Sequence, residues 1–102
     1  MTEDHEDLIE RILQEEERLI GKHNNSCKET IKNVEKEMNI LKKVGNPDSD
    51  VKEYLESLDQ ILVSKITMLV DLRNNVLNFY RDVKSEEKMA KLHKDFNGHY
   101  TP

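Results

Sequence analysis

The sequence predicts an all-α fold: a long antiparallel helical hairpin that pairs with a second copy into a dimeric four-helix bundle. Two long stretches carry apolar residues at helical spacing, and one cluster of helix breakers, Gly45–Ser49, separates them near the middle of the 102-residue chain. The second stretch is also more apolar than one partner helix can cover. We therefore expect a single helical-hairpin domain over residues 1–102.

The composition excludes several classes of protein. Charged residues make up 36% of the chain and aromatic residues 5%, a balance that suits long exposed helices better than a thick globular core. The formal net charge of −5 gives no electrostatic support to nucleic-acid binding. The most apolar run, Ile61–Leu72, contains Lys65 and Asp71 and so cannot span a bilayer. The single cysteine, Cys27, excludes an internal disulfide and favours a reducing compartment.

The first helix is expected over about residues 4–44, because Thr2 and Asp4 can cap a helix whose first turn is acidic. Gly21 and the polar residues that follow it have poor helix propensity, so a kink is expected there if anywhere. Apolar residues recur every seven positions along one line, which we expect to face the second helix. This line consists of Leu13, Ile20, Cys27, Val34 and Leu41.

The second helix is expected over about residues 50–95, after a loop at about 45–49 and before a tail at about 96–102. Asp48 or Asp50 can cap its start, and Asn97-Gly98 can end it. Its seam advances in alternating steps of four and three residues, as in a coiled coil. The seam residues are Val51, Leu55, Leu58, Leu62, Lys65, Leu69, Leu72, Val76, Phe79 and Val83, with Tyr54, Ile61 and Met68 on one flank.

A short loop makes the two helices antiparallel neighbours, and folding about residue 46 or 47 pairs positions whose numbers sum to about 93. In this register apolar residues meet apolar residues along the hairpin. The expected pairs include Leu41 with Val51, Met38 with Leu55, Val34 with Leu58, Ile31 with Leu62, and Cys27 with Ile66.

The second helix has apolar surface left over after this pairing, and exposed apolar bands of this size usually mark an interface. A two-fold homodimer is the simplest way to cover it, either as two closed hairpins or as opened, swapped helices. Lys65 would either extend its ammonium out of the seam or fix the register of the assembly. The residues expected at the interface are Leu58, Ile61, Leu62, Lys65, Ile66, Met68, Leu69 and Leu72.

No catalytic, cofactor or metal site is predicted, so we do not expect an enzyme. The histidines lack metal-ligand spacing with each other or with Cys27, and the three glycines form no phosphate loop. His23 is interpreted as a seam residue and Cys27 as a small core hydrophobe. The lysines of Lys84–Lys94 are interpreted as a solvated face, the alternative being a docking site for tubulin or acidic lipid.

The runs Glu15–Ile20 and Val34–Met38 resemble the segment that follows the motor domain in internal-motor kinesins, the kinesin-13 family. The resemblance covers roughly Glu15 to Arg81, most of the chain. It continues in order through Leu41, Val44, Pro47, Tyr54, Leu58, Ile61-Leu62, Lys65, Leu69, Leu72-Arg73, Val76 and Phe79.

The resemblance implies a non-catalytic C-terminal module that dimerises and regulates an ATP-driven, microtubule-depolymerising motor. It also implies a cytoplasmic location on the cytoskeleton, at microtubules of the spindle and at the centromere. The alternative is a heterotypic helical module that docks a kinesin motor domain, tubulin, or a centromere or spindle adaptor through the same apolar band. Neither hypothesis involves nucleic acid or a membrane.

Overall fold

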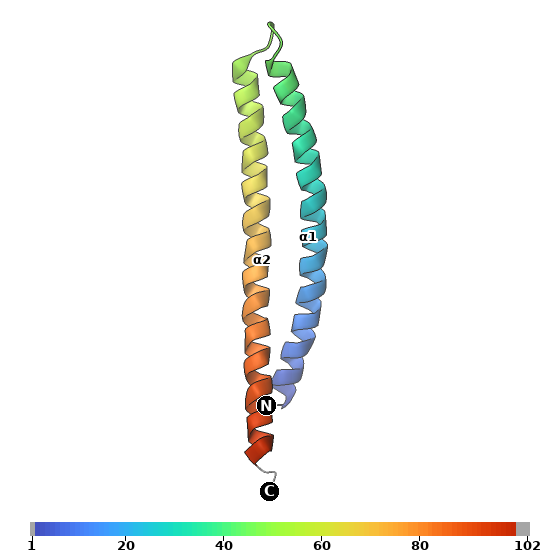
Figure 1. Ribbon diagram of the computed structural model, residues 1–102, viewed down its shortest axis with the longest axis vertical. Helices are drawn as coiled ribbons and strands as arrows, with labels where there is room; N and C mark the ends of the chain where they lie inside the picture. The colour runs from blue at the N-terminus through green and yellow to red at the C-terminus, as the bar shows by residue number, and fades with distance from the viewer. Residues whose placement is uncertain (1, 100–102) are drawn as a thin grey trace. The chain divides into compact units, whose positions relative to one another are not determined.

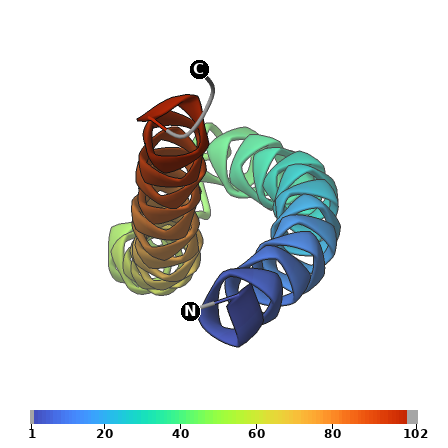
Figure 2. The same ribbon diagram turned by 90° about the horizontal axis from the view of Figure 1, so that it is seen from below.

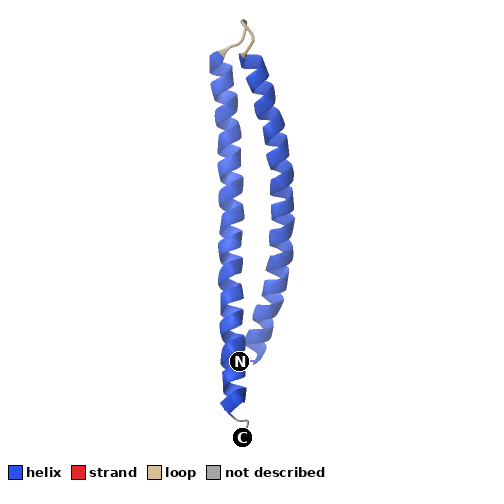
Figure 3. Cartoon of the chain, in the orientation of Figure 1, coloured by secondary structure: helices blue, strands red, loops and turns tan. Residues whose placement is uncertain are grey.

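The structure, a computed structural model, describes the backbone of residues 2–99 and the side chains of residues 5–92 and 94. It contains two helices, α1 (Thr2–Val44) and α2 (Val51–His99), joined by a short loop into an antiparallel hairpin (Figure 1 and Figure 2). No β-strand occurs among residues 2–99 (Figure 3). The predicted all-α hairpin is therefore confirmed.

The helix ends near the loop agree with the prediction to within one residue, because the breakers there are several and adjacent. The expected stop at Asn97-Gly98 is wrong, since α2 continues to His99. An isolated glycine in a helix costs about 1 kcal/mol relative to alanine, which is too little to end a long helix. Gly21 likewise lies within α1. The last three residues of the predicted tail, 100–102, lie outside the described residues.

Side chains at the loop satisfy the backbone groups that the helix ends leave unpaired. The Asp50 carboxylate accepts a hydrogen bond from the Lys52 backbone N–H at 2.9 Å, so Asp50 caps the start of α2. The Ser49 hydroxyl donates to the Val44 carbonyl at 3.0 Å and caps the end of α1. Of the two predicted caps, Asp50 is the one that acts.

Contacts divide the chain into two compact units. Unit 1 pairs Met1–Ile20 with Asn74–Pro102, and unit 2 is the continuous segment Gly21–Arg73 with the loop. In unit 1 Arg11 Nε lies 3.3 Å from Asp82 Oδ2. In unit 2 Lys22 Nζ lies 3.2 Å from Asp71 Oδ2. The residue numbers of these two ion pairs add up to 93, as in the predicted register, whereas those of the Lys65–Glu37 pair add up to 102.

The face that α1 turns toward α2 is not the predicted one. The predicted line is exposed: Leu13 and Ile20 keep about 60% of their surface, Val34 and Leu41 about half, and Cys27 is exposed as well. His23, expected in the seam, is also exposed. The buried and half-buried positions follow a different stripe, about half of which is polar. They are His5, Leu8, Ile12, Glu15, Leu19, Lys22, Ser26, Asn33, Glu37, Ile40 and Val44.

The inner face of α2 is rotated by about 60° from the predicted seam. Five of the ten predicted seam residues are half-buried, namely Leu58, Lys65, Leu72, Phe79 and Val83. The other five are exposed, and the predicted flank Tyr54, Ile61 and Met68 takes their place inside. The observed stripe keeps the steps of four and three. It runs through Tyr54, Leu58, Ile61, Lys65, Met68, Leu72, Asn75, Phe79, Asp82, Glu86 and Met89.

Replacing the cap, Asp50→Ala, should lower the free energy of unfolding by about 1 kcal/mol, because the Lys52 N–H loses its acceptor. Asp50→Asn should retain most of the stability. Urea unfolding followed by circular dichroism measures both. Asp48→Ala is the matched control in the same loop and should leave the midpoint unchanged. Equal losses at Asp48 and Asp50 would contradict the capping role.

Candidate functional site

The candidate site of unit 2 is its exposed apolar surface, to which both helices contribute. Eleven large apolar side chains of this unit are exposed, and nine of them, which keep between 42% and 62% of their surface, stand on two outward stripes; the other two, Val63 and Val70, lie elsewhere on α2. The nine are Ile31, Val34, Met38 and Leu41 on α1, and Val51, Leu55, Leu62, Ile66 and Leu69 on α2.

These two stripes lie on the same side of unit 2. Successive residues of an α-helix are about 100° apart around the helix axis. On each helix the stripe lies roughly 70–150° around the axis from the inner face, and the direction of this rotation along the chain is the same for α1 and α2. Because α1 and α2 run antiparallel, equal rotations bring the stripes to one side of the helix pair. We call this side of unit 2 the apolar face. Cys27 falls on the α1 stripe and therefore belongs to it.

The opposite side of unit 2 is polar. The same helical geometry places uncharged and charged polar residues there on both helices. They are Lys32, Lys36, Asn39 and Lys43 on α1, and Glu53, Gln60, Ser64 and Thr67 on α2, all exposed. Unit 2 is therefore two-sided, with one side suited to water and the other to an apolar partner.

Unit 1 has outward apolar residues of its own. Ile9, Leu13 and Ile20 on α1 keep from 39% to 61% of their surface. On α2 the exposed large apolar residues of this unit are Val76, Leu77, Tyr80 and Leu92. Outward apolar stripes are thus a property of each unit separately.

The predicted interface residues divide into two groups. Leu62, Ile66 and Leu69 are exposed and belong to the apolar face. The other five lie on the inner stripe of α2: Ile61 is buried, and Leu58, Lys65, Met68 and Leu72 are half-buried. The prediction missed the α1 half of the apolar face, although the signal was present: the seven-residue line of α1 is the very stripe that faces outward.

Lys65 does not extend into water but forms an ion pair inside unit 2. Its Nζ lies 2.8 and 3.0 Å from the two carboxylate oxygens of Glu37. Side chains on a helix lean toward its N-terminus, and in an antiparallel pair this brings Lys65 and Glu37 toward each other although they are offset along the helices. Both side chains are less than one-third exposed. The lysine therefore has an acidic partner that the sequence pattern did not reveal.

Unit 1 holds a second polar cluster, around the buried Asp82. Arg11 pairs with Asp82, and Glu15 adjoins the same carboxyl group. Burial raises the pKa of Glu15, and the hydrogen bond and negative charge of Asp82 raise it further. The Glu15 Oε2 atom is shielded from solvent and has no hydrogen-bond partner. This part of the seam therefore places two carboxyl groups next to each other.

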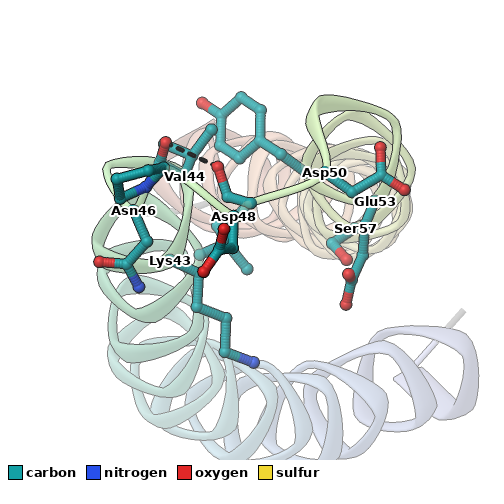
Figure 4. Close-up of a pocket in the computed structure, with 11 residues that line it drawn as sticks. Lys43, Val44, Asn46, Asp48, Asp50, Glu53 and Ser57 are labelled. Carbon is teal, nitrogen blue, oxygen red and sulfur yellow. Dashed lines mark hydrogen bonds between the residues drawn. The ribbon is translucent and has the colours of Figure 1, made fainter.

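The cleft at the loop end of unit 2 offers no catalytic set. Its volume is about 540 Å³, and its walls come from the end of α1, the loop and the start of α2 (Figure 4). Its carboxylates are Asp48, Asp50 and Glu53, of which Asp50 serves as the helix cap. Ser49, which also lines it, donates its hydroxyl to a backbone carbonyl. Its lining includes Lys43 but no histidine or cysteine.

Nowhere among the described side chains do three or more His, Cys, Asp or Glu residues gather closely enough to hold a metal ion. Within the described parts of α1 and α2, no stretch is long and apolar enough to cross a membrane.

Sequence comparison relates the chain to plant kinesin-like proteins. It is 34% identical over 83 residues to the kinesin-like protein KIN-13A of Oryza sativa subsp. japonica, and 29% identical over 85 residues to KIN-13B of Arabidopsis thaliana. These alignments cover 81% and 83% of this chain but only 10% and 12% of the relatives. The chain thus spans about a tenth of the length of the curated relatives it matches.

Two further comparisons found nothing. No family model matches the sequence, and no solved structure matches it. The similarity to KIN-13 proteins therefore agrees with the kinesin-13 resemblance over most of this chain, without specifying a domain of those proteins.

Reversing the charge at the inner seam, Lys65→Glu, should lower the free energy of unfolding by about 1–3 kcal/mol, because two carboxylates then meet in a half-buried site. The swapped pair Lys65→Glu/Glu37→Lys should recover most of the loss. Urea unfolding at one fixed protein concentration measures the coupling. Lys36→Glu, on the exposed polar side, is the control. No recovery in the double variant would show that Lys65 and Glu37 are not coupled.

Removing the charge of Glu15 with Glu15→Gln should stabilise the protein at pH 7 by roughly 0.5 kcal/mol, because a like-charge contact is lost. With a raised pKa, folded Glu15 binds a proton more readily than unfolded Glu15. The Glu15 carboxyl therefore lowers the free energy of unfolding of the wild type as the pH rises above 4.5, the ordinary pKa of a glutamate.

The stability gain of Glu15→Gln should accordingly shrink as the pH is lowered toward 4.5. Thermal unfolding between pH 4.5 and 7 tests this, with the exposed Glu17→Gln as the matched control. A gain that stays constant over this range would contradict the role assigned to the Glu15–Asp82 contact.

Proposed function

We propose that this chain is a non-catalytic, helical assembly module of a kinesin-13-type protein, which holds two copies together and regulates the motor to which it belongs. Its similarity to a short segment of two KIN-13 proteins supports the kinesin relationship. By this relationship the parent protein would be an ATP-driven motor that depolymerises microtubules, and the chain would act on the cytoskeleton.

One observation carries the assembly role. Of the large hydrophobic side chains that the structure describes, eighteen are exposed and only Leu8 and Ile61 are buried. Monomeric soluble proteins rarely expose contiguous apolar patches larger than a few hundred Å², and nine of these side chains share one side of unit 2. Helices of this kind gain most of their stability from packing an apolar face rather than from helix propensity. A helix pair with its apolar side in water therefore lacks its main stabilising contact.

The free energy available from covering the apolar face of unit 2 is of the same size as the cost of association. Full burial of an aliphatic side chain contributes about 1.5–3 kcal/mol, so covering a half-exposed one contributes about 0.7–1.5 kcal/mol. The nine side chains of the face together would supply roughly 7–13 kcal/mol. This is comparable to the estimated cost of about 4–15 kcal/mol for bringing two molecules together.

A heterotypic role through the same apolar surface is the alternative, with a kinesin motor domain, tubulin or an adaptor as partner. The exposed lysines of the Lys84–Lys94 stretch would suit an acidic partner such as tubulin. Lys84 Nζ, however, lies over the Tyr80 ring at 4.7 Å from its centre, which engages one of these charges within unit 1. The apolar surface, rather than the lysines, is therefore the better-supported contact.

Sedimentation equilibrium between about 1 and 100 µM distinguishes the two roles. Self-association predicts a mass approaching twice 12.0 kDa as concentration rises. Helicity and thermal midpoint should rise with it, because association stabilises the folded chain by mass action. A well-folded chain that stays at 12.0 kDa over the whole range would contradict self-association and favour the heterotypic role.

A further inference from the structure

We propose that two copies of the chain pack face to face through the apolar face of unit 2, so that α1 and α2 each contribute about half of the interface. This inference rests on the proposed self-association and specifies its surface. It differs from an assembly centred on α2 alone, because four of the nine face residues belong to α1.

The surface is of the size that a stable dimer needs. Covering a half-exposed aliphatic side chain contributes about 0.7–1.5 kcal/mol. At about 25 cal/mol per Å², this corresponds to roughly 30–60 Å² of apolar area per side chain. The nine residues then offer about 300–500 Å² of apolar area per copy. Since interfaces are about 60% apolar, the full contact with its polar rim would bury about 500–800 Å² per copy, close to the standard size.

A second copy is the occupant that fits this face best. A two-fold interface uses the same patch on both molecules, so the patch must complement itself. A charged patch would repel its own copy, but the face residues are aliphatic or sulfur-containing and carry no charge. The width also matches, because each copy presents two parallel stripes and packing two such layers produces a four-helix arrangement.

The inner ion pairs leave this face free for a partner. Lys65 and Glu37 bind each other within unit 2, and both remain less than one-third exposed. Their charges are therefore satisfied inside one chain and need not be desolvated again when the second copy arrives. The surface that remains to be covered is the apolar one alone.

The test compares one apolar-face variant on each helix with a control on the polar side. Met38→Glu alters the α1 stripe and Leu69→Glu the α2 stripe, at side chains that are 51% and 55% exposed in the single chain. Asn39→Glu and Ser64→Glu introduce the same charge at exposed positions on the opposite side. Sedimentation equilibrium measures each dissociation constant, and circular dichroism verifies that each variant is helical.

We expect Met38→Glu and Leu69→Glu each to weaken dimerisation at least tenfold, while both controls dimerise as the wild type does. A wild-type dimer that only Leu69→Glu disrupts would overturn the two-helix face in favour of α2 alone. A dimer insensitive to both variants would overturn this interface while leaving self-association standing. A wild type that is monomeric throughout would overturn both proposals.

Cys27 supplies a second measurement that does not depend on the glutamate variants folding. It lies on the α1 stripe and is exposed in the single chain. Its rate of alkylation by iodoacetamide in the wild type should fall as protein concentration rises, in proportion to the fraction of free chains. A Ser64→Cys/Cys27→Ser variant reports on the polar side and should react at a rate independent of concentration. Concentration-independent alkylation of Cys27 in a proven dimer would overturn the proposed face.

Discussion

The structure depends on a mixed contact between the two helices, in which polar and charged side chains stand among apolar ones while many large apolar side chains face outward. Within unit 2 the contact holds the Lys65–Glu37 ion pair and the buried Asn33, and within unit 1 it holds Asp82 and Arg11. Removing charges from water costs free energy that their mutual attraction only partly repays. The polar groups of each interior therefore add little to stability, and apolar burial, inside the units and on the outward surface, is the larger favourable contribution available.

This distribution links folding to association. Long helices with exposed apolar stripes gain little from propensity, and α1 carries Gly21 and a run of weak helix formers in its interior. The division between the two units falls beside that glycine on α1 and beside Asn74 on α2. Any partner that covers an apolar stripe stabilises the folded chain by mass action, so the populations of folded and assembled molecules rise together.

The sequence was sufficient for the fold but not for the inner face. Breakers clustered at 45–49 mark the loop, and chain length and loop shortness determine the register, which Arg11–Asp82 and Lys22–Asp71 both obey. The apolar periodicity then misleads, because it identifies the most apolar stripe and assumes that this stripe faces inward. Here Leu13, Val34 and Leu41 belong to the most apolar stripe and face outward. Glu37 and Asn33 could not be recognised as inner residues, because a polar side chain carries no periodic signal that separates it from the solvated positions around it.

The ion pairs explain why the less apolar faces are turned inward. A rotation of each helix by about 60° would bring the predicted seams together, but it would separate Lys65 from Glu37 and Arg11 from Asp82 and leave half-buried charges without partners. The charged residues between the helices thus favour one rotation of the helices, because the other rotation would leave these charges unpaired. This selectivity lowers stability somewhat, as a polar seam residue does when it selects one arrangement of a coiled coil. The selected rotation keeps Val34, Met38, Leu62 and Leu69 on the outside. The ion pairs that specify how α1 and α2 pack within one chain therefore also determine which surface is available to a second molecule.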